Sequence, residues 1–359
     1  MKAVEDVIFR RHDEALRFVI PWVLQHIDLP KKTIVEIGAG SGSSSLAFSH
    51  CCSKVKAYDI DGKSSIGFLK RKELFDSEDR LTFKICESGN LIDVALEDKK
   101  PGDVILFYAV VEHLTIEERL KYLGKVWRAL DAGEFLIVVE MPNRLAYFDG
   151  HTSRAPFLHF LPDELLLSYL KYFKHTVGNQ DLAIRFGDTL LEAATQGVKQ
   201  FSLTRVRVGL GVSFHEFEIA FGCNLNDVVI ADGFDQPIIN WFPVSVNYQL
   251  LLSYWGSVNH DIPAGFARSV LSFIFYKPKD EGERRRIAAD NRRKSVEIKK
   301  IYSLTGQLEN QGLMLEERWA TIRNLEAIIS AQASRADSLG AIARFSIRIA
   351  RLLKSACRR

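Results

Sequence analysis

The chain has 359 residues, of which 47% are hydrophobic and 26% are charged, with 48 Lys and Arg against 45 Asp and Glu. This hydrophobic content excludes an intrinsically disordered chain, and at about 100–200 residues per domain the length predicts two structural units. The net charge of +3 by itself says little about partners. Nucleic acid is not expected as a partner, because the main part of the chain shows no basic stripe interleaved with aromatic residues.

The cysteines and the first residues indicate a cytoplasmic protein. The five cysteines have no metal-ligand spacing, and their odd number argues against a disulfide framework. We therefore expect a reducing compartment and no metal site. Residues 1–18 contain no uninterrupted apolar segment typical of a secretion signal. No stretch reaches the roughly 18 apolar residues of a membrane-spanning helix.

Strands and helices alternate regularly along the first part of the chain. Residues 1–30 have apolar residues at helical spacing and predict an amphipathic helix, which Pro21 divides or kinks. Five buried strands are then predicted, at residues 33–37, 55–59, 81–85, 103–108 and 134–140. Helices are expected after the first strand through Cys51 and over residues 62–75. This alternation predicts an α/β fold with a doubly wound, mostly parallel sheet.

The helix predicted over residues 115–130 has clear ends. Thr115 and Glu118 form a capping-box pattern at its start, and Gly133 lies just beyond its last residue. Two later segments, 212–221 and 270–276, predict a final antiparallel pair of strands. They would complete a seven-stranded sheet.

Composition divides the chain into two domains, at residues 1–278 and 279–359. Within the first, insertions at about 142–212 and 222–269 interrupt the alternation of strands and helices and would cover a ligand-binding site. From Ile301 an apolar residue recurs every seventh position through Ala350. A heptad repeat predicts a coiled coil and thus a homo-oligomer formed through the helix. The alternative is a helix that packs on the first domain of its own chain.

A glycine-rich loop follows the first predicted strand. Glu36 lies within the end of that strand, and glycines at 38, 40 and 42 allow the backbone to turn tightly and approach a ligand. Asp59 ends the second strand, where a carboxylate can accept hydrogen bonds from both hydroxyls of a ribose. The GxGxG spacing differs from the GxGxxG of dinucleotide sites, because position 43 is Ser. The pattern favours a ligand with a cationic amino-acid end.

These motifs resemble those of the class I S-adenosylmethionine (SAM)-dependent methyltransferases. VEIGAGSG is similar to the first motif of that family, and FYAVVEHL (107–114) to its fourth-strand motif. The resemblance covers residues 30–145, and it implies a methyltransferase with SAM as cofactor. The cofactor-binding residues that it implies are Glu36, Gly38, Ala39, Gly40, Gly42, Asp59, Ile60, Glu87 and Tyr108. Glu87 departs from the usual form of its motif, where an Asp-Ala pair is common.

The segment 141–162 is similar to a stretch found in a bacterial subgroup of this family. It follows the fifth predicted strand, at the sheet edge where open α/β sheets bind ligands. The predicted acceptor-binding residues are Asn143, Arg144, Tyr147, His151 and His159. His113 and His151 are candidate general bases for a hydroxyl acceptor. Alternatively, His113 only hydrogen-bonds the cofactor loop, and Arg144 and His151 only hold their own segment in place.

The last residues, 343–359, contain six basic residues and no acidic one. Apolar and basic side chains separate on a helical projection, which is typical of a helix lying at an anionic membrane surface. The alternative is a solvated end of the coiled coil. Together these features predict peripheral contact with the inner face of a bacterial membrane.

The expected reaction is O-methylation of a sugar, a glycan or another small polar acceptor. Two other functions stay open. One is a scaffold protein whose SAM-binding domain is not catalytic. The other is an NAD-dependent oxidoreductase, which Ser43 disfavours because a third glycine is missing.

Overall fold

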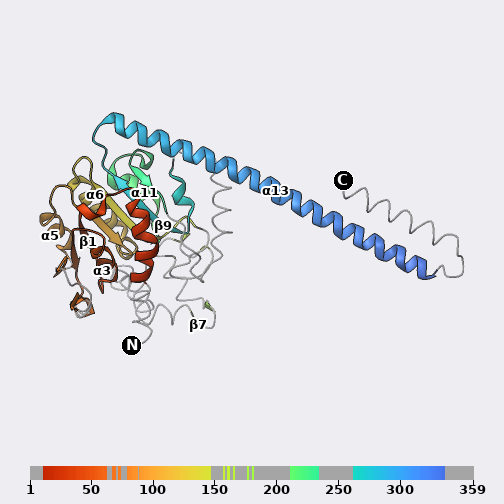
Figure 1. Ribbon diagram of the computed structural model, residues 1–359, viewed down its shortest axis with the longest axis horizontal. Coiled ribbons are helices and arrows are strands. Elements are labelled where there is room, and N and C mark those ends of the chain that lie inside the picture. Colours follow the sequence, from red (N-terminus) through yellow and green to blue (C-terminus); the bar gives the residue numbers. More distant parts are fainter. Residues whose placement is uncertain are drawn as a thin grey trace. The chain divides into compact units, whose positions relative to one another are not determined.

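A computed structural model describes most of the chain (Figure 1). The described residues are 11–62, 67–69, 72–73, 79–87, 89–146, 157, 160–161, 165, 176–177, 180–181, 211–233 and 262–335. Three predicted site residues, Tyr147, His151 and His159, and the basic segment 343–359 lie outside them. The chain divides into two compact units, Met1–Lys299 and Lys300–Arg359.

The first unit contains a seven-stranded sheet in the order β3-β2-β1-β4-β5-β9-β8. Its strands are β1 (Thr33–Ile37), β2 (Lys54–Asp59), β3 (Leu81–Ile85), β4 (Val104–Tyr108), β5 (Phe135–Pro142), β8 (Val229–Ala231) and β9 (Val270–Tyr276). β1 to β5 pair in parallel, whereas β9 runs antiparallel to both of its neighbours, β5 and β8. The predicted α/β fold with a mostly parallel sheet of seven strands is therefore confirmed.

The helical elements of the described residues include several short ones. They are η1 (Ala15–Val19), α2 (Ile20–Leu24), η2 (Leu29–Lys31), α3 (Ser43–Ser49), α5 (Leu91–Glu97), η3 (Val111–His113), α6 (Ile116–Ala129), α11 (Phe214–Phe221), η6 (Leu225–Asp227), η7 (Ala264–Ala267) and α13 (Glu281–Arg335). A separate pair of two-residue strands, β6 (Thr176–Val177) and β7 (Gln180–Asp181), lies outside the main sheet. The predicted capping box of α6 is confirmed, because Glu118 N donates to Thr115 Oγ1 and Thr115 N donates to Glu118 Oε2.

Two hydrophobic cores cover the two faces of the sheet. In β4 the side chains alternate: Ile105 and Phe107 enter one core, while Leu106 and Tyr108 enter the other. The first core includes residues of α5, α6 and α11, and the second includes residues of η1, α2 and α3. Both faces of the central strands are thus buried, which explains why their sequences are continuously apolar.

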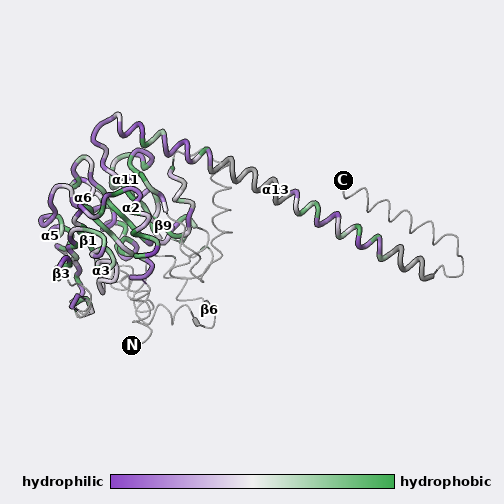
Figure 2. The backbone as a smooth tube through the Cα atoms, viewed as in Figure 1, coloured by the Kyte–Doolittle hydropathy of each residue, from purple (hydrophilic) through white to green (hydrophobic). Residues whose placement is uncertain are grey.

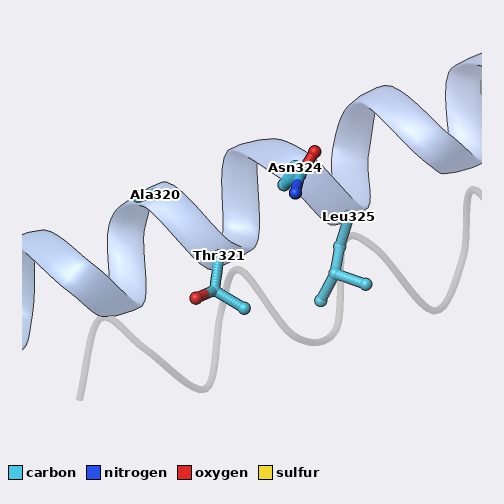
Figure 3. A pocket seen from close by; sticks show the side chains of 4 residues that line it. All are labelled: Ala320, Thr321, Asn324 and Leu325. Atoms are coloured by element: carbon cyan, nitrogen blue, oxygen red, sulfur yellow. The ribbon is translucent and has the colours of Figure 1, made fainter.

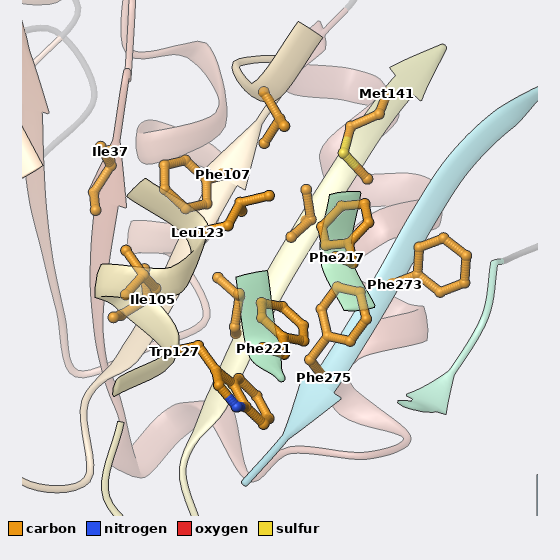
Figure 4. Close-up of a cluster of buried hydrophobic side chains, with 14 of the residues drawn as sticks. Ile37, Ile105, Phe107, Leu123, Trp127, Met141, Phe217, Phe221, Phe273 and Phe275 are labelled. Carbon is orange, nitrogen blue, oxygen red and sulfur yellow. The ribbon is translucent and has the colours of Figure 1, made fainter. Parts of the chain in front are cut away.

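Aromatic rings fill the first core between α6, α11 and β9 (Figure 4). Trp127 of α6 stacks on Phe221 of α11 with ring centroids 4.3 Å apart, and Phe221 meets Phe275 of β9 edge to face at 5.0 Å. Phe217 lies 5.2 Å from the same Phe275 ring. This cluster joins elements that are far apart in the sequence.

The predicted strand over residues 212–221 is wrong, because the structure has helix α11 there. Phe214, Phe217 and Phe221 recur at helical spacing and face the core or its edge. Ser213 and Glu216 form a capping box, and Gly222 ends the helix in the left-handed conformation. The strand that pairs with β9 is instead β8, a short segment within the region predicted to be the insertion 222–269.

The N-terminal lead-in is helical as predicted, and it runs through Pro21 without a break, with a change in its hydrogen-bonding pattern just before that residue. Residues 15–19 form one turn of π-helix, and α2 then begins with Pro21 in its first turn. Proline removes a backbone donor, so the change in hydrogen-bonding pattern falls where that donor is missing.

Helix α13 begins in the first unit, where its early residues pack on β8. Asn291 is 6% exposed, and its Nδ2 donates to the backbone oxygens of Asn226 and Val229. Hydrophilic residues predominate further along the helix and are interrupted by apolar ones (Figure 2). A pocket there is lined by Ala320, Thr321, Asn324 and Leu325 (Figure 3). The long helix agrees with the sequence pattern, while the pairing of that helix stays a prediction.

Within the described ranges, no helix has both the length and the apolar character needed to cross a bilayer.

Candidate functional site

The glycine loop joins β1 to α3 at the carboxyl edge of the sheet. Gly38 N and Ala39 N both donate to Tyr58 O, at 2.8 and 3.0 Å. Gly38, Gly40 and Gly42 all have positive φ angles, of 78°, 53° and 77°. The loop is therefore fixed against the end of β2 in a conformation that glycine adopts most readily.

The three glycines differ in what surrounds them. A Cβ at Gly42 would lie 2.0 Å from Phe68 Cδ2, and one at Gly38 would lie 2.6 Å from Val110 Cγ2. A Cβ at Gly40 would meet no atom within 4 Å. Gly38 and Gly42 are thus required by packing within the protein, whereas Gly40 leaves its backbone open to a ligand.

Asp59 lies at the end of β2, directly beside this open position. Its Oδ2 accepts a hydrogen bond of 2.6 Å from Gly40 N, and its Oδ1 accepts one of 2.8 Å from Asp61 N. The side chain is 7% exposed. A carboxylate has about four acceptor positions, so each oxygen retains the capacity to accept from a further donor, such as a hydroxyl.

Glu36 fastens the start of α3 beneath the loop. Its carboxyl is fully buried and accepts hydrogen bonds from the hydroxyls of Ser44 and Ser45. Burial raises the pKa of Glu36 to about 7, although the two serine hydroxyls and the charge of Arg11 act in the opposite direction. Glu36 therefore holds the start of α3, which follows the glycine loop, against the end of β1.

We expect stability to depend on pH through Glu36. A raised carboxyl pKa means that the folded protein binds a proton that the unfolded chain releases near pH 4.5, so the free energy of unfolding falls as pH rises to about 7. The loss should reach about 3 kcal/mol. Glu36→Gln should remove this slope in urea unfolding measured from pH 5 to 8. The exposed Glu97→Gln is the control and should retain it, and an unchanged slope in Glu36→Gln would contradict the assignment.

Tyr108 ends β4, is itself buried, and belongs to a partly buried polar cluster with Arg11 and Glu140. Its hydroxyl donates to Glu140 Oε1 at 2.9 Å, and burial raises the pKa of this hydroxyl well above its usual range. The Arg11 guanidinium lies 5.4 Å from the centre of the Tyr108 ring and 3.7 Å from Glu140 Oε2. Glu140 has a φ of 61° at a bulge in β5. Such backbone strain concentrates at functional sites.

The remaining predicted cofactor residues lie at the ends of neighbouring strands. Ile60 directly follows Asp59 and is 44% exposed, and Glu87 is exposed two residues after β3. His113 ends η3, the short helix after β4, and its Nε2 lies 3.9 Å from Glu112 Oε1. The carboxyl ends of β1 to β4 therefore carry these residues along one edge of the sheet, where open α/β sheets bind ligands.

Asn143, predicted to bind the acceptor, makes contacts within the protein. It is 2% exposed, its Nδ2 donates to Phe266 O and Arg268 O at 2.6 and 2.7 Å, and its Oδ1 accepts from Leu145 N. The backbone N of Arg144 donates to Val212 O. Asn143 thus joins the end of β5 to the segment that precedes β9.

No local pattern in the sequence singles out Arg11, Glu140 or the buried Arg119. Arg11 and Arg119 lie within helical patterns, where a basic residue is typical of a solvated face. Glu140 was assigned only to its strand. Only the fold shows that Arg11 and Glu140 flank the end of β4. No group of three His, Cys, Asp or Glu side chains among the described residues is arranged to hold a metal ion.

Neither protein-family models nor curated protein sequences match this chain. Solved structures similar to part of it include magnesium protoporphyrin IX methyltransferase from Synechocystis PCC 6803 with bound SAH, at 20% identity and a TM-score of 0.32 over 40% of this chain and 62% of that one. An rRNA methylase from Streptococcus thermophilus matches at 15% identity and a TM-score of 0.27, over 32% and 65% of the two chains. The SAM-dependent methyltransferase SibL in its apo form matches at 12% identity and a TM-score of 0.36, over 72% and 54%. This chain spans less than two thirds of the length of each.

Proposed function

We propose that this protein is a SAM-dependent methyltransferase. The observation that carries the proposal is the pairing of Asp59 with Gly40, in which a buried carboxylate and an open backbone position lie side by side at the end of β2. The two hydroxyls of a ribose placed there would donate hydrogen bonds to Asp59, and the nucleoside that contains this ribose would lie close to Gly40.

The residues present fit this cofactor better than a dinucleotide. Position 43, where a dinucleotide fingerprint has its third glycine, is a buried serine at the start of α3. The buried carboxyl of Glu36 lies under the same helix start and, when ionised, would oppose a pyrophosphate there. When bound, SAM supplies a methyl group on a sulfonium, which is already activated for transfer to a nucleophile.

The protein would then mainly align the acceptor and exclude water. We propose that the acceptor is a sugar, a glycan or another small polar molecule, methylated on oxygen. A hydroxyl acceptor must lose its proton, and His113, at the end of η3 beside β4, would accept it. The position of His113 supports this role, because η3 follows β4, and β4 pairs with β1, the strand that precedes the glycine loop.

Calorimetric titration of the intact protein with SAM tests this proposal, with NAD titrated in parallel. We expect SAM to bind with micromolar affinity and NAD to show no heat of binding. SAM consumption in the presence of nucleotide sugars and glycan extracts then identifies the acceptor. Binding of NAD alone would favour an oxidoreductase, and SAM binding without turnover on any acceptor would favour a scaffold.

We further propose that α13 forms a homo-oligomer with a second copy of the chain. Its support is a set of apolar side chains on α13 that are exposed in the single chain, namely Leu313, Met314, Leu315, Trp319 and Leu325. Water contact with so many large apolar groups on one helix is costly unless a partner covers them.

Truncation separates this oligomer from the catalytic unit. A chain ending at Lys299 should be monomeric in sedimentation and should bind SAM as the intact protein does. A chain ending at Lys279 should lose about 1–3 kcal/mol in addition, because Asn291 no longer satisfies two buried backbone oxygens next to β8. Unchanged oligomerisation in the chain ending at Lys299 would contradict the role of α13.

A further inference from the structure

Arg119 is the largest fully buried side chain among the described residues, with 1% of its surface exposed. It belongs to the first turns of α6, directly after η3. Its Nε donates to Val111 O at 2.9 Å, and its Nη2 donates to Glu112 O at 3.2 Å. Two carbonyls of η3 are therefore held by one guanidinium.

The other side of the same guanidinium holds a distant part of the chain. Arg119 Nη1 donates to Gly211 O at 2.9 Å and to Glu216 Oε1 at 2.7 Å. Glu216 is 6% exposed, and its second oxygen accepts from Ser213 N in the capping box of α11. The planar fork of Arg119 thus links η3 to the start of α11.

Gly211 lies where the chain returns to the sheet edge after residues 147–210. Val212 N donates to Pro142 O and Arg144 N donates to Val212 O, so this return is paired with the end of β5. A Cβ at Gly211 would lie 2.6 Å from Arg144 Cα. The start and the end of the inserted segment are therefore held together, and Arg119 holds that junction against η3.

We propose that Arg119 is a positioning residue for the acceptor side of the site. It sets η3, which carries His113, at a fixed place relative to the junction of residues 142–144 with 211–212. This inference rests on the proposed function. Arg119 makes no hydrogen bond to Gly40 or Asp59, which follow β1 and β2, and it reaches the glycine loop only through Val110, which precedes η3 and packs on Gly38. We therefore expect cofactor affinity to depend only weakly on Arg119.

The chain offers a matched control at the opposite end of β4 and β5, the strands that precede η3 and Asn143. Lys99 and Glu134 form an ion pair of 2.6 Å, with side chains 5% and 4% exposed, just before β4 and β5 begin. Substitution of Lys99 by Met removes a buried cation of comparable burial without touching η3 or Gly211. It reports what loss of a buried ion pair does to the whole domain.

The test compares Arg119→Lys, Arg119→Met and Lys99→Met by hydrogen exchange and by SAM calorimetry. Lysine keeps the charge opposite Glu216 but, as a point donor, cannot reach all four acceptors. We expect the amides of His113, Arg144 and Val212 to exchange at least about tenfold faster in both Arg119 variants, relative to the amides of β1. The dissociation constant for SAM should stay within about twofold of the parent.

Three results would overturn the proposal. If these amides exchange as slowly in Arg119→Lys as in the parent, Arg119 has no effect on them. If they exchange as fast in Lys99→Met as in Arg119→Lys, the effect is global. The third result is a large loss of SAM affinity in Arg119→Lys. Hydrogen exchange does not require turnover, so failure of the parent to bind SAM would refute the proposed function separately. Once an acceptor is found, Arg119→Lys should raise its KM or lower kcat.

Discussion

Asp59→Ala is expected to weaken SAM binding by at least about 100-fold, because two hydrogen bonds from hydroxyls to a buried carboxylate contribute about 1.5–3 kcal/mol each. Asp59→Asn retains one acceptor oxygen and should cause a smaller loss. Calorimetric titration of the parent and both variants with SAM measures the effect.

Asp103→Ala is the matched control for this experiment. Asp103 is 6% exposed against 7% for Asp59, and it also accepts a backbone hydrogen bond, from Lys100 N at 2.9 Å. It lies just before β4, at the amino edge of the sheet. We expect Asp103→Ala to lower stability without changing SAM affinity. Parent-like affinity in Asp59→Ala would remove the main support for the proposed function.

Gly42→Ala is expected to act mainly on stability, and Gly40→Ala mainly on SAM binding. At Gly42 the new Cβ would lie 2.0 Å from Phe68 Cδ2, at a φ of 77°. The left-handed conformation and the overlap together should cost about 3 kcal/mol of stability. At Gly40, with a φ of 53° and no atom within 4 Å of the new Cβ, the conformation alone should cost about 1 kcal/mol.

Gly40→Ala should nevertheless lose SAM binding, because its methyl group would occupy the space beside Asp59 that the proposed ligand needs. Urea unfolding measures the first effect, and SAM calorimetry measures the second. The folded Gly40→Ala protein thus tests the site without the complication of unfolding. If Gly40→Ala bound SAM with the affinity of the parent, SAM could not lie beside Gly40 as proposed.

The strands of the sheet could be predicted because burial on both faces leaves a continuous apolar run, as in VILFY of β4. The capping box of α6 was equally local. The segment 212–221 was predicted as a strand because FHEFEIAF also approximates the alternation of a strand. The sequence also contains helix signals there, namely the capping-box pair Ser213 and Glu216 and the terminal Gly222, and packing on α6 and β9 agrees with those signals.

The candidate site was predictable only where its residues are adjacent in sequence to a glycine loop or a strand end. Gly40 and Asp59 met this condition, and the structure brings them to hydrogen-bonding distance. Arg119 did not, because its four acceptors come from residues up to 97 positions away. Asn143 was predicted from its place after β5, but its contacts depend on Phe266 and Arg268, which no local pattern connects to it.

The antiparallel strand β9 has a consequence for how the chain is made. β5 is synthesised early, yet the partner for its outer edge is β9, roughly 130 residues later, a delay on the order of ten seconds at the ribosome. During that interval the edge of β5 has unpaired backbone donors and acceptors beside Leu136, Ile137 and Val138, all fully buried in the finished protein. We therefore expect this edge of β5 to be the part of the nascent sheet most prone to pairing with other chains until β9 is made.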